Sequence, residues 1–157
     1  ETSFYPFLQE TAKLLRKASS FCYLKGEALY HYVMNPASAS HTFVSDKWKD
    51  YSLLYSCIRD AFGRDKTFDF SNQIDRCLLF FLYNTVGEIL GAELSQKEKK
   101  RRILEILRTK DVMEMFDRIN IMALPISIKQ KLITLIYKYR MGISLLIAYF
   151  ERKQHCK

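Results

Sequence analysis

Apolar residues recur every three or four positions along most of the chain, which is the spacing of amphipathic helices. This spacing predicts helices over residues 3–18, 45–62, 71–90, 95–107 and 111–119, and a last helix from Ser127 into the C-terminal region. The segment 71–90 is apolar on nearly all sides, which places it at the centre of the helical part. One face of the last helix carries a periodic apolar set, namely Ile128, Leu132, Leu135, Tyr139, Ile143, Leu146 and Phe150.

Local signals support several of these helix ends. Ser45 can cap the second helix, and Gly63 can stop it. A capping-box pattern, in which a residue with a short polar side chain is followed three positions later by Glu or Gln, begins at Ser95, Asp111 and Ser127. We therefore expect helices to open at these three residues.

Residues 21–41 have a different pattern. Phe21–Leu24 and Ala28–Met34 read as two short strands, joined by a turn at residues 25–27 and followed by an Asn35-Pro36 turn. Two strands are too few for an independent sheet, so we expect them to complete a sheet whose other strands lie before Glu1. The chain then reads as a fragment of a longer protein.

The predicted fold class is mainly α, with a short α/β remnant (a helix plus two strands) followed by a helical bundle. The corresponding domains are residues 1–43 and 44–157. No internal repeat and no low-complexity segment is visible.

The net charge of +8 and the pI of about 9.3 favour anionic partners: phosphates, nucleic acid or an acidic membrane surface. Basic residues are mixed with acidic ones along the chain, and no nucleic-acid-binding signature is present, which argues against nucleic acid. The four cysteines have no CxxC spacing, so we expect free thiols in a reducing compartment rather than disulfides or a metal site. A cytoplasmic protein fits best, with the inner face of the membrane as an alternative place.

Two features have both a structural and a functional interpretation. The basic run at residues 97–102 is either a solvated helix face or a contact for phosphate or lipid headgroups. The uncharged segment Met141–Phe150 is either a core helix packed against residues 74–90, which we favour, or an interfacial membrane anchor or dimer seam. No Gly-rich phosphate loop, GxSxG, HExxH or DxD motif is present, so a self-contained active site is not expected.

One stretch resembles a known family. Tyr30-His31-Tyr32, Asn35-Pro36 and Ser38-Ala39-Ser40-His41 look like the end of the catalytic domain in family 2 glycosyltransferases, bacterial nucleotide-sugar-dependent enzymes of the GT-A fold. Such chains carry an "LYHY…NP.S.S" segment a few dozen residues after a Glu-Asp pair. The opening Glu1-Thr2-Ser3-Phe4 resembles the tail of that pair's motif, and the resemblance extends over about residues 1–43.

The resemblance implies an inverting transferase for polysaccharide or cell-surface glycans, with a nucleotide-sugar donor and a glycan or lipid-linked acceptor. By its spacing Glu1 would be the catalytic base, although the family usually has Asp there. Ser38, Ser40 and His41 would bind substrate, and the parent enzyme would use Mg²⁺ or Mn²⁺, with no cofactor held by this chain. Alternatively, Glu1 is a first-turn acid, and His31 is a core histidine. In the same alternative, the Ser and Ala residues of 37–40 merely suit a tight loop, and His41 begins the next segment.

Without the upstream half and its metal-binding motif, we expect no transfer activity from this chain alone. The alternative function is a helical interaction module for dimerisation or peripheral membrane attachment.

Overall fold

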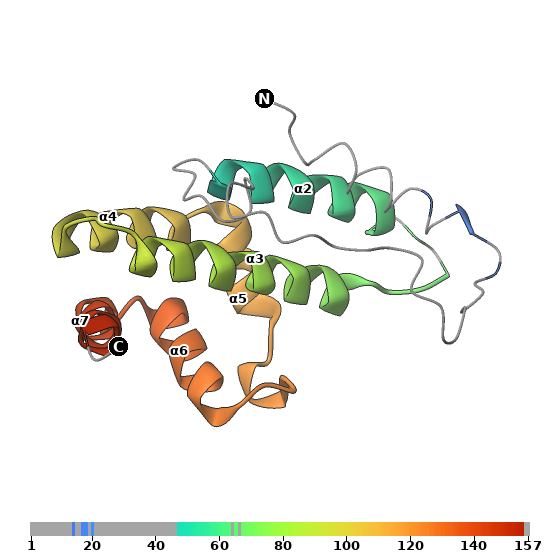
Figure 1. Cartoon of the computed structure of the whole chain (residues 1–157). Helices are drawn as coiled ribbons and strands as arrows, with labels where there is room; N and C mark the ends of the chain where they lie inside the picture. Colours follow the sequence, from blue (N-terminus) through green and yellow to red (C-terminus); the bar gives the residue numbers. More distant parts are fainter. Residues whose placement is uncertain are drawn as a thin grey trace, which may run out of the picture. The chain divides into compact units, whose positions relative to one another are not determined.

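The structure is a computed structural model that describes residues 14, 17, 18, 20, 47–63, 65 and 67–155. These residues contain six α-helices, one short 3-10 helix and no β-strand, so the described part is mainly helical, as predicted (Figure 1). The two predicted strands and the predicted boundary at residues 43–44 lie outside the described residues. The predicted helix 3–18 also lies almost wholly outside them.

The chain divides into two compact units, Glu1–Asp65 and Lys66–Lys157. The described part of the first unit is essentially helix α2 (Lys47–Phe62), which buries Leu54 and Tyr55. The helix ends before Gly63, whose amide donates to the Arg59 carbonyl at 2.7 Å. A Cβ at this glycine would lie only 2.6 Å from that carbonyl oxygen, so the close approach requires glycine. The predicted stop at Gly63 is confirmed.

The second unit is built around α3 (Ser71–Gly91). This helix packs against α4 (Gln96–Leu107), α5 (Lys110–Arg118) and α7 (Ile143–His155), and α4 also packs against α5 and α7. Figure 1 shows α4 folding back alongside α3. The predicted central position of α3 is confirmed by its buried apolar side chains, namely Ile74, Leu78, Leu79, Phe81, Leu82, Val86, Ile89 and Leu90.

The predicted helix starts agree with the structure at two of the three capping patterns. The Ser127 hydroxyl accepts from the Gln130 amide, and the Gln130 side chain accepts from the Ser127 amide, which completes a capping box at the start of α6 (Ile128–Tyr139). The Ser95 hydroxyl accepts from the Glu98 amide at 3.3 Å at the start of α4.

The third start is wrong by two residues, because the cap residue is Thr109 rather than Asp111. Helix α5 opens at Lys110 after Thr109, not at Asp111. The Thr109 hydroxyl donates back to the Ile106 carbonyl, and the Thr109 carbonyl accepts the first helical bond of α5 from Met113. Thr109 therefore closes α4 and opens α5, which leaves no role for Asp111 as a cap.

The prediction of one continuous last helix is also wrong. Helix α6 ends at Tyr139, and α7 begins at Ile143 after a turn in which Arg140 has a φ of 57° and Gly142 a φ of 76°. The predicted apolar face is divided by this turn. Ile143 and Leu146 of α7 are buried against the unit, whereas Ile128, Leu132 and Tyr139 of α6 are exposed.

Polar and aromatic contacts help to hold helix α6 to the unit. It contacts the 3-10 helix η2 (Ile121–Ala123), and its Thr134 and Tyr137 are its fully buried side chains. The rings of Tyr83 on α3 and Tyr137 lie 5.8 Å apart between centroids. The Tyr83 hydroxyl hydrogen-bonds to the Thr134 hydroxyl and donates to the Gln130 carbonyl at 3.0 Å.

Candidate functional site

The predicted catalytic and substrate-binding residues are Glu1, Ser38, Ser40 and His41. All four lie outside the described residues, as does His31. Their roles therefore stay predictions. The sites that the structure does describe are the basic run of α4, two polar clusters between helices, and the outer side of α6 and α7.

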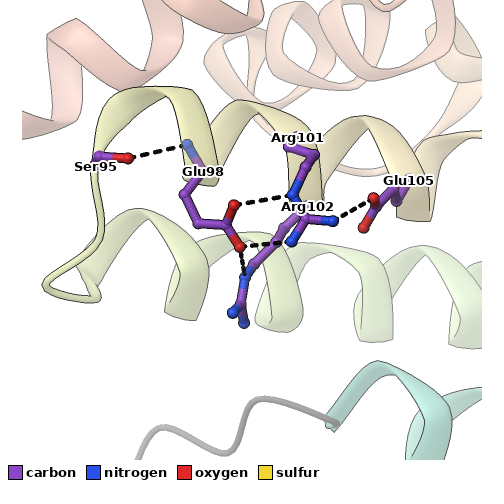
Figure 2. A network of polar contacts seen from close by, with 5 residues as sticks. All are labelled: Ser95, Glu98, Arg101, Arg102 and Glu105. Carbon is purple, nitrogen blue, oxygen red and sulfur yellow. Dashed lines mark hydrogen bonds and ion pairs between the residues drawn. The ribbon is translucent and has the colours of Figure 1, made fainter.

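The basic run contains an ion-pair network along α4, which Figure 2 shows. The Glu98 carboxylate accepts from both the Nε and Nη2 of Arg101, at 2.9 and 2.6 Å, and from the Nε of Arg102 at 2.7 Å. Arg101 also pairs with Glu105 at 2.5 Å. The hydrogen bonds from Arg101 and Arg102 lower the pKa of Glu98 to about 2. Much of the positive charge of this run is therefore balanced within the helix itself.

Lys99, in the middle of the same run, points into the protein. Its side chain is buried, and its Nζ donates to the Leu90 carbonyl at 3.0 Å and pairs with Glu151 at 3.4 Å. Gln96 donates to the same Glu151 carboxylate at 2.6 Å. Lys97 and Lys100 are exposed. The run is thus not a continuous cationic face, which weakens its interpretation as a phosphate contact.

Lys99, Gln96 and Glu151 form one polar cluster between helices, and a second one joins α3 to α5. The carboxylate of Asp75 is buried and accepts two hydrogen bonds from Arg118, at 3.0 and 2.7 Å. Arg118 also lies 3.7 Å from Glu114. The two-pronged geometry suits a guanidinium and a carboxylate, and the pair links elements 43 residues apart in the chain. Sequence reasoning missed this pair because the helical pattern does not say which polar residue faces which neighbour.

The two tyrosines between α3 and α6, half-buried Tyr83 and buried Tyr137, have altered acidity. Burial raises the pKa of Tyr83, although the hydrogen bond with Thr134 opposes this effect. Burial also raises the pKa of Tyr137, and the nearby Tyr83 adds to the increase. The raised pKa keeps both phenols neutral at neutral pH. The Tyr83 hydroxyl hydrogen-bonds to α6, and Tyr137 packs against the Tyr83 ring.

The outer side of α6 and α7 exposes large apolar side chains. The exposed fraction is 87% for Ile128, 77% for Leu145 and 74% for Met141, and Leu132, Tyr139 and Tyr149 are exposed as well. Single exposed apolar residues are ordinary, but a group on neighbouring helices indicates a contact surface. The α6 members of this group were missed because the sequence pattern placed them on a buried face. Met141, Leu145 and Tyr149 lie in the segment for which the sequence left a core helix, a membrane anchor and a dimer seam as alternatives.

The described part of the chain contains neither a metal-ligand cluster nor a membrane-spanning helix. Among those residues, no three His, Cys, Asp or Glu side chains lie close enough together to hold a metal ion. None of the described helices has the length and apolar character that crossing a bilayer requires. Cys57 and Cys77 are free thiols, and burial raises the pKa of Cys77.

Comparisons of the chain with protein-family models, with curated proteins and with solved structures gave no match in any of the three.

Proposed function

We propose that this chain is the C-terminal portion of a nucleotide-sugar-dependent glycosyltransferase that acts in polysaccharide or cell-surface glycan synthesis. The observation that carries the proposal is the combined pattern over residues 29–41, in which Tyr30-His31-Tyr32 is followed by Asn35-Pro36 and by Ser38-Ala39-Ser40-His41. In this proposal residues 1–43 complete the α/β catalytic domain with a helix and two strands. The helical part, residues 44–157, is an interaction module without catalytic chemistry.

The chemistry of the reaction fits the proposed residues. The acceptor hydroxyl must lose its proton as its oxygen attacks the anomeric carbon, and a carboxylate such as that of Glu1 can take that proton. The departing nucleoside diphosphate gains negative charge. The Ser38 and Ser40 hydroxyls and the His41 ring can donate hydrogen bonds to that charge from a loop.

The divalent metal that the resemblance implies has no ligand group among the described residues. In the proposal its ligands belong to the nucleotide-binding half of the enzyme. Cys57 and Cys77, which are free thiols, support a cytoplasmic location for the enzyme.

The test begins with the gene region encoding the residues before Glu1. The protein that includes them should release nucleoside diphosphate from a nucleotide sugar when Mg²⁺ or Mn²⁺ and a glycan acceptor are present, and the present chain should not. In that longer protein, Glu1→Gln should lower the turnover number by roughly 10²–10⁴-fold, as expected for the loss of a general base. A matched control is Glu10→Gln, which removes a second acid of the predicted first helix.

Three results would contradict the proposal. The first is an upstream region with no glycosyltransferase domain. The second is sugar-nucleotide turnover by the present chain alone. The third is an equal loss of activity in Glu1→Gln and Glu10→Gln, which would remove the catalytic role from Glu1.

A further inference from the structure

A surface that combines basic and apolar side chains covers the outer side of α6 and α7. We call it the α6–α7 surface and define it by six exposed or half-buried residues: Lys129, Leu132, Leu145, Tyr149, Arg152 and Lys153. Ile128, with 87% of its side chain exposed, precedes Leu132 by one helical turn and extends the apolar part. Its apolar members come from both helices of the pair.

The members of this surface are physical neighbours. The Nζ of Lys129 on α6 donates to the Tyr149 hydroxyl on α7 at 3.2 Å and lies 5.3 Å from the centre of its ring. Leu132 follows Lys129 by three residues, and Leu145 precedes Tyr149 by four, which places each pair side by side on its helix. The same spacing brings Arg152 and Lys153 beside Tyr149. The surface is therefore continuous from α6 to α7.

The electrostatics agree with this arrangement. The hydrogen bond from Lys129 lowers the pKa of Tyr149, and the charges of Lys129 and Lys153 lower it further. Lys129 contacts the phenol directly, and Lys153 follows Tyr149 by one helical turn, so two cations lie beside the aromatic centre of the surface. A basic group beside exposed aromatic and aliphatic side chains is the composition of proteins that lie in the headgroup region of a membrane.

The positive charge of α6 and α7 is not balanced locally. These helices and their turn contain a single acidic residue, Glu151, and six basic ones, Lys129, Lys131, Lys138, Arg140, Arg152 and Lys153. Glu151 is occupied by Lys99 and Gln96.

Three of the six basic residues bind main-chain carbonyls within the unit. Lys131 binds that of Met122, Lys138 that of Phe116, and Arg140 that of Leu107. The other three, Lys129, Arg152 and Lys153, form no ion pair within the described part of the chain. They belong to the α6–α7 surface.

We propose that the α6–α7 surface binds the anionic surface of a lipid bilayer, with Leu132, Leu145 and Tyr149 entering the headgroup region and the three cations contacting lipid phosphates. Charge complementarity selects this occupant. In a symmetric pair of chains joined through this surface, the unpaired cations of each copy would face those of the other, which is repulsive. An anionic bilayer satisfies both the charges and the apolar side chains.

This inference names the partner for the interaction role proposed for the helical part, and it holds whether or not residues 1–43 belong to a glycosyltransferase. A failure of membrane binding leaves the sugar-transfer test unaffected. Likewise, an upstream region without a glycosyltransferase domain leaves the vesicle experiment unaffected.

The experiment is flotation of the full chain with vesicles of phosphatidylcholine alone or with about one third phosphatidylglycerol. We expect binding to the anionic vesicles at 0.1 M salt and loss of most of it at 0.5 M, because salt screens the headgroup charge. Arg152→Gln combined with Lys153→Gln should weaken binding by more than about tenfold, since each basic residue near an anionic surface contributes roughly fivefold. Leu145→Ser should weaken it at both salt concentrations, because its contribution is apolar.

The matched control is Arg76→Gln combined with Lys110→Gln, which removes two positive charges from exposed positions on α3 and α5. It should leave binding within about twofold of the unchanged chain. Circular dichroism of every variant checks that the helices remain folded, which is expected because all the altered side chains are exposed.

Three results would overturn the proposal. The first is no flotation with anionic vesicles at low salt. The second is an equal loss in the surface variant and the control variant, which would mean that only net charge matters. The third is a dimer in light scattering that Leu145→Ser dissociates while vesicle binding is unchanged, which would assign the surface to a second copy.

Discussion

The ammonium group of Lys99 on α4 lies 3.4 Å from the carboxylate of Glu151 on α7, and the same ammonium donates to the Leu90 carbonyl near the end of α3. One buried cation thus joins three helices of the second unit. The Leu90 carbonyl belongs to the last turn of α3, where no helical amide remains to bind it. Lys138 and Arg140 bind carbonyls at the ends of α5 and α4 in the same way. The negative ends of three helices are therefore bound by cations from other parts of the unit.

Removing Lys99 should destabilise the second unit. Lys99→Met keeps most of the hydrocarbon chain but leaves the Leu90 carbonyl and the Glu151 carboxylate without this donor. We expect the free energy of unfolding to fall by about 1–3 kcal/mol, since Glu151 is partly hydrated and loses less than a fully buried partner would. Urea unfolding followed by circular dichroism measures the change. The control Lys100→Met alters an exposed neighbour and should stay within about 0.5 kcal/mol of the unchanged chain; equal losses in the two variants would contradict the role of Lys99.

The pair between Asp75 and Arg118 should respond asymmetrically to substitution. The Asp75 side chain is 6% exposed and that of Arg118 is 47% exposed. Arg118→Gln leaves a buried carboxylate without its main partner and should cost about 2–4 kcal/mol. Asp75→Asn leaves a guanidinium that water can reach, and should cost about 1–2 kcal/mol.

Urea unfolding of both variants and of the double variant completes the measurement. The double variant should be less destabilised than the sum of the two single variants, because the second change removes no further charge pair. Asp117→Asn, at an exposed position next to Arg118, is the control. A larger loss of stability in Asp75→Asn than in Arg118→Gln would contradict the expectation that an unpaired buried carboxylate costs more than an unpaired, hydrated guanidinium.

The network of Glu98 predicts a defined pH dependence. Arg101 and Arg102 hold the pKa of Glu98 at about 2, below its ordinary value of 4.5. A carboxyl with a lowered pKa in the folded state stabilises that state above its unfolded pKa, and the contribution disappears as the pH falls through the folded value. The chain should therefore be more stable than Glu98→Gln at pH 6, and the difference should shrink between pH 4.5 and about 2.

The measurement is urea unfolding of both proteins at several pH values in this range. Glu93→Gln, an exposed acid outside the network, should show no difference from the unchanged chain at pH 6. A difference between the chain and Glu98→Gln that stays constant down to pH 2 would show that the network contributes through packing rather than through charge.

The helices were predictable from sequence because their signals are local. The apolar spacing of residues 71–90 depends on one helix alone, and the Ser127–Gln130 capping box involves residues three positions apart. The stop at Gly63 is local too, because its amide reaches back only four residues, to Arg59. Each of these features can be recognised without knowing what the helix packs against.

The contacts between helices were not predictable in the same way. The spacing of Ile128, Leu132 and Tyr139 continues in phase with that of Ile143 and Leu146, so the pattern alone gives one long buried face. The turn at residues 140–142 breaks that phase in space without changing the spacing in sequence. Lys99 was grouped with its basic neighbours for a similar reason, because only the position of Glu151 in the fold draws it inward.

The turn between α6 and α7 gives the last prediction. Gly142 has a φ of 76°, a backbone conformation that residues with a Cβ atom rarely adopt. A Cβ there would meet nothing closer than the Ile136 side chain at 3.9 Å, so the cost of Gly142→Ala should be conformational, at about 1–2 kcal/mol.

Gly87 is the matched control, because it lies inside α3, and a Cβ there would meet no atom within 4 Å. Gly87→Ala should stabilise the chain by up to about 1 kcal/mol through its higher helix propensity. Urea unfolding should thus give opposite signs for the same chemical change, and a stabilising Gly142→Ala would mean that α6 and α7 join without this turn.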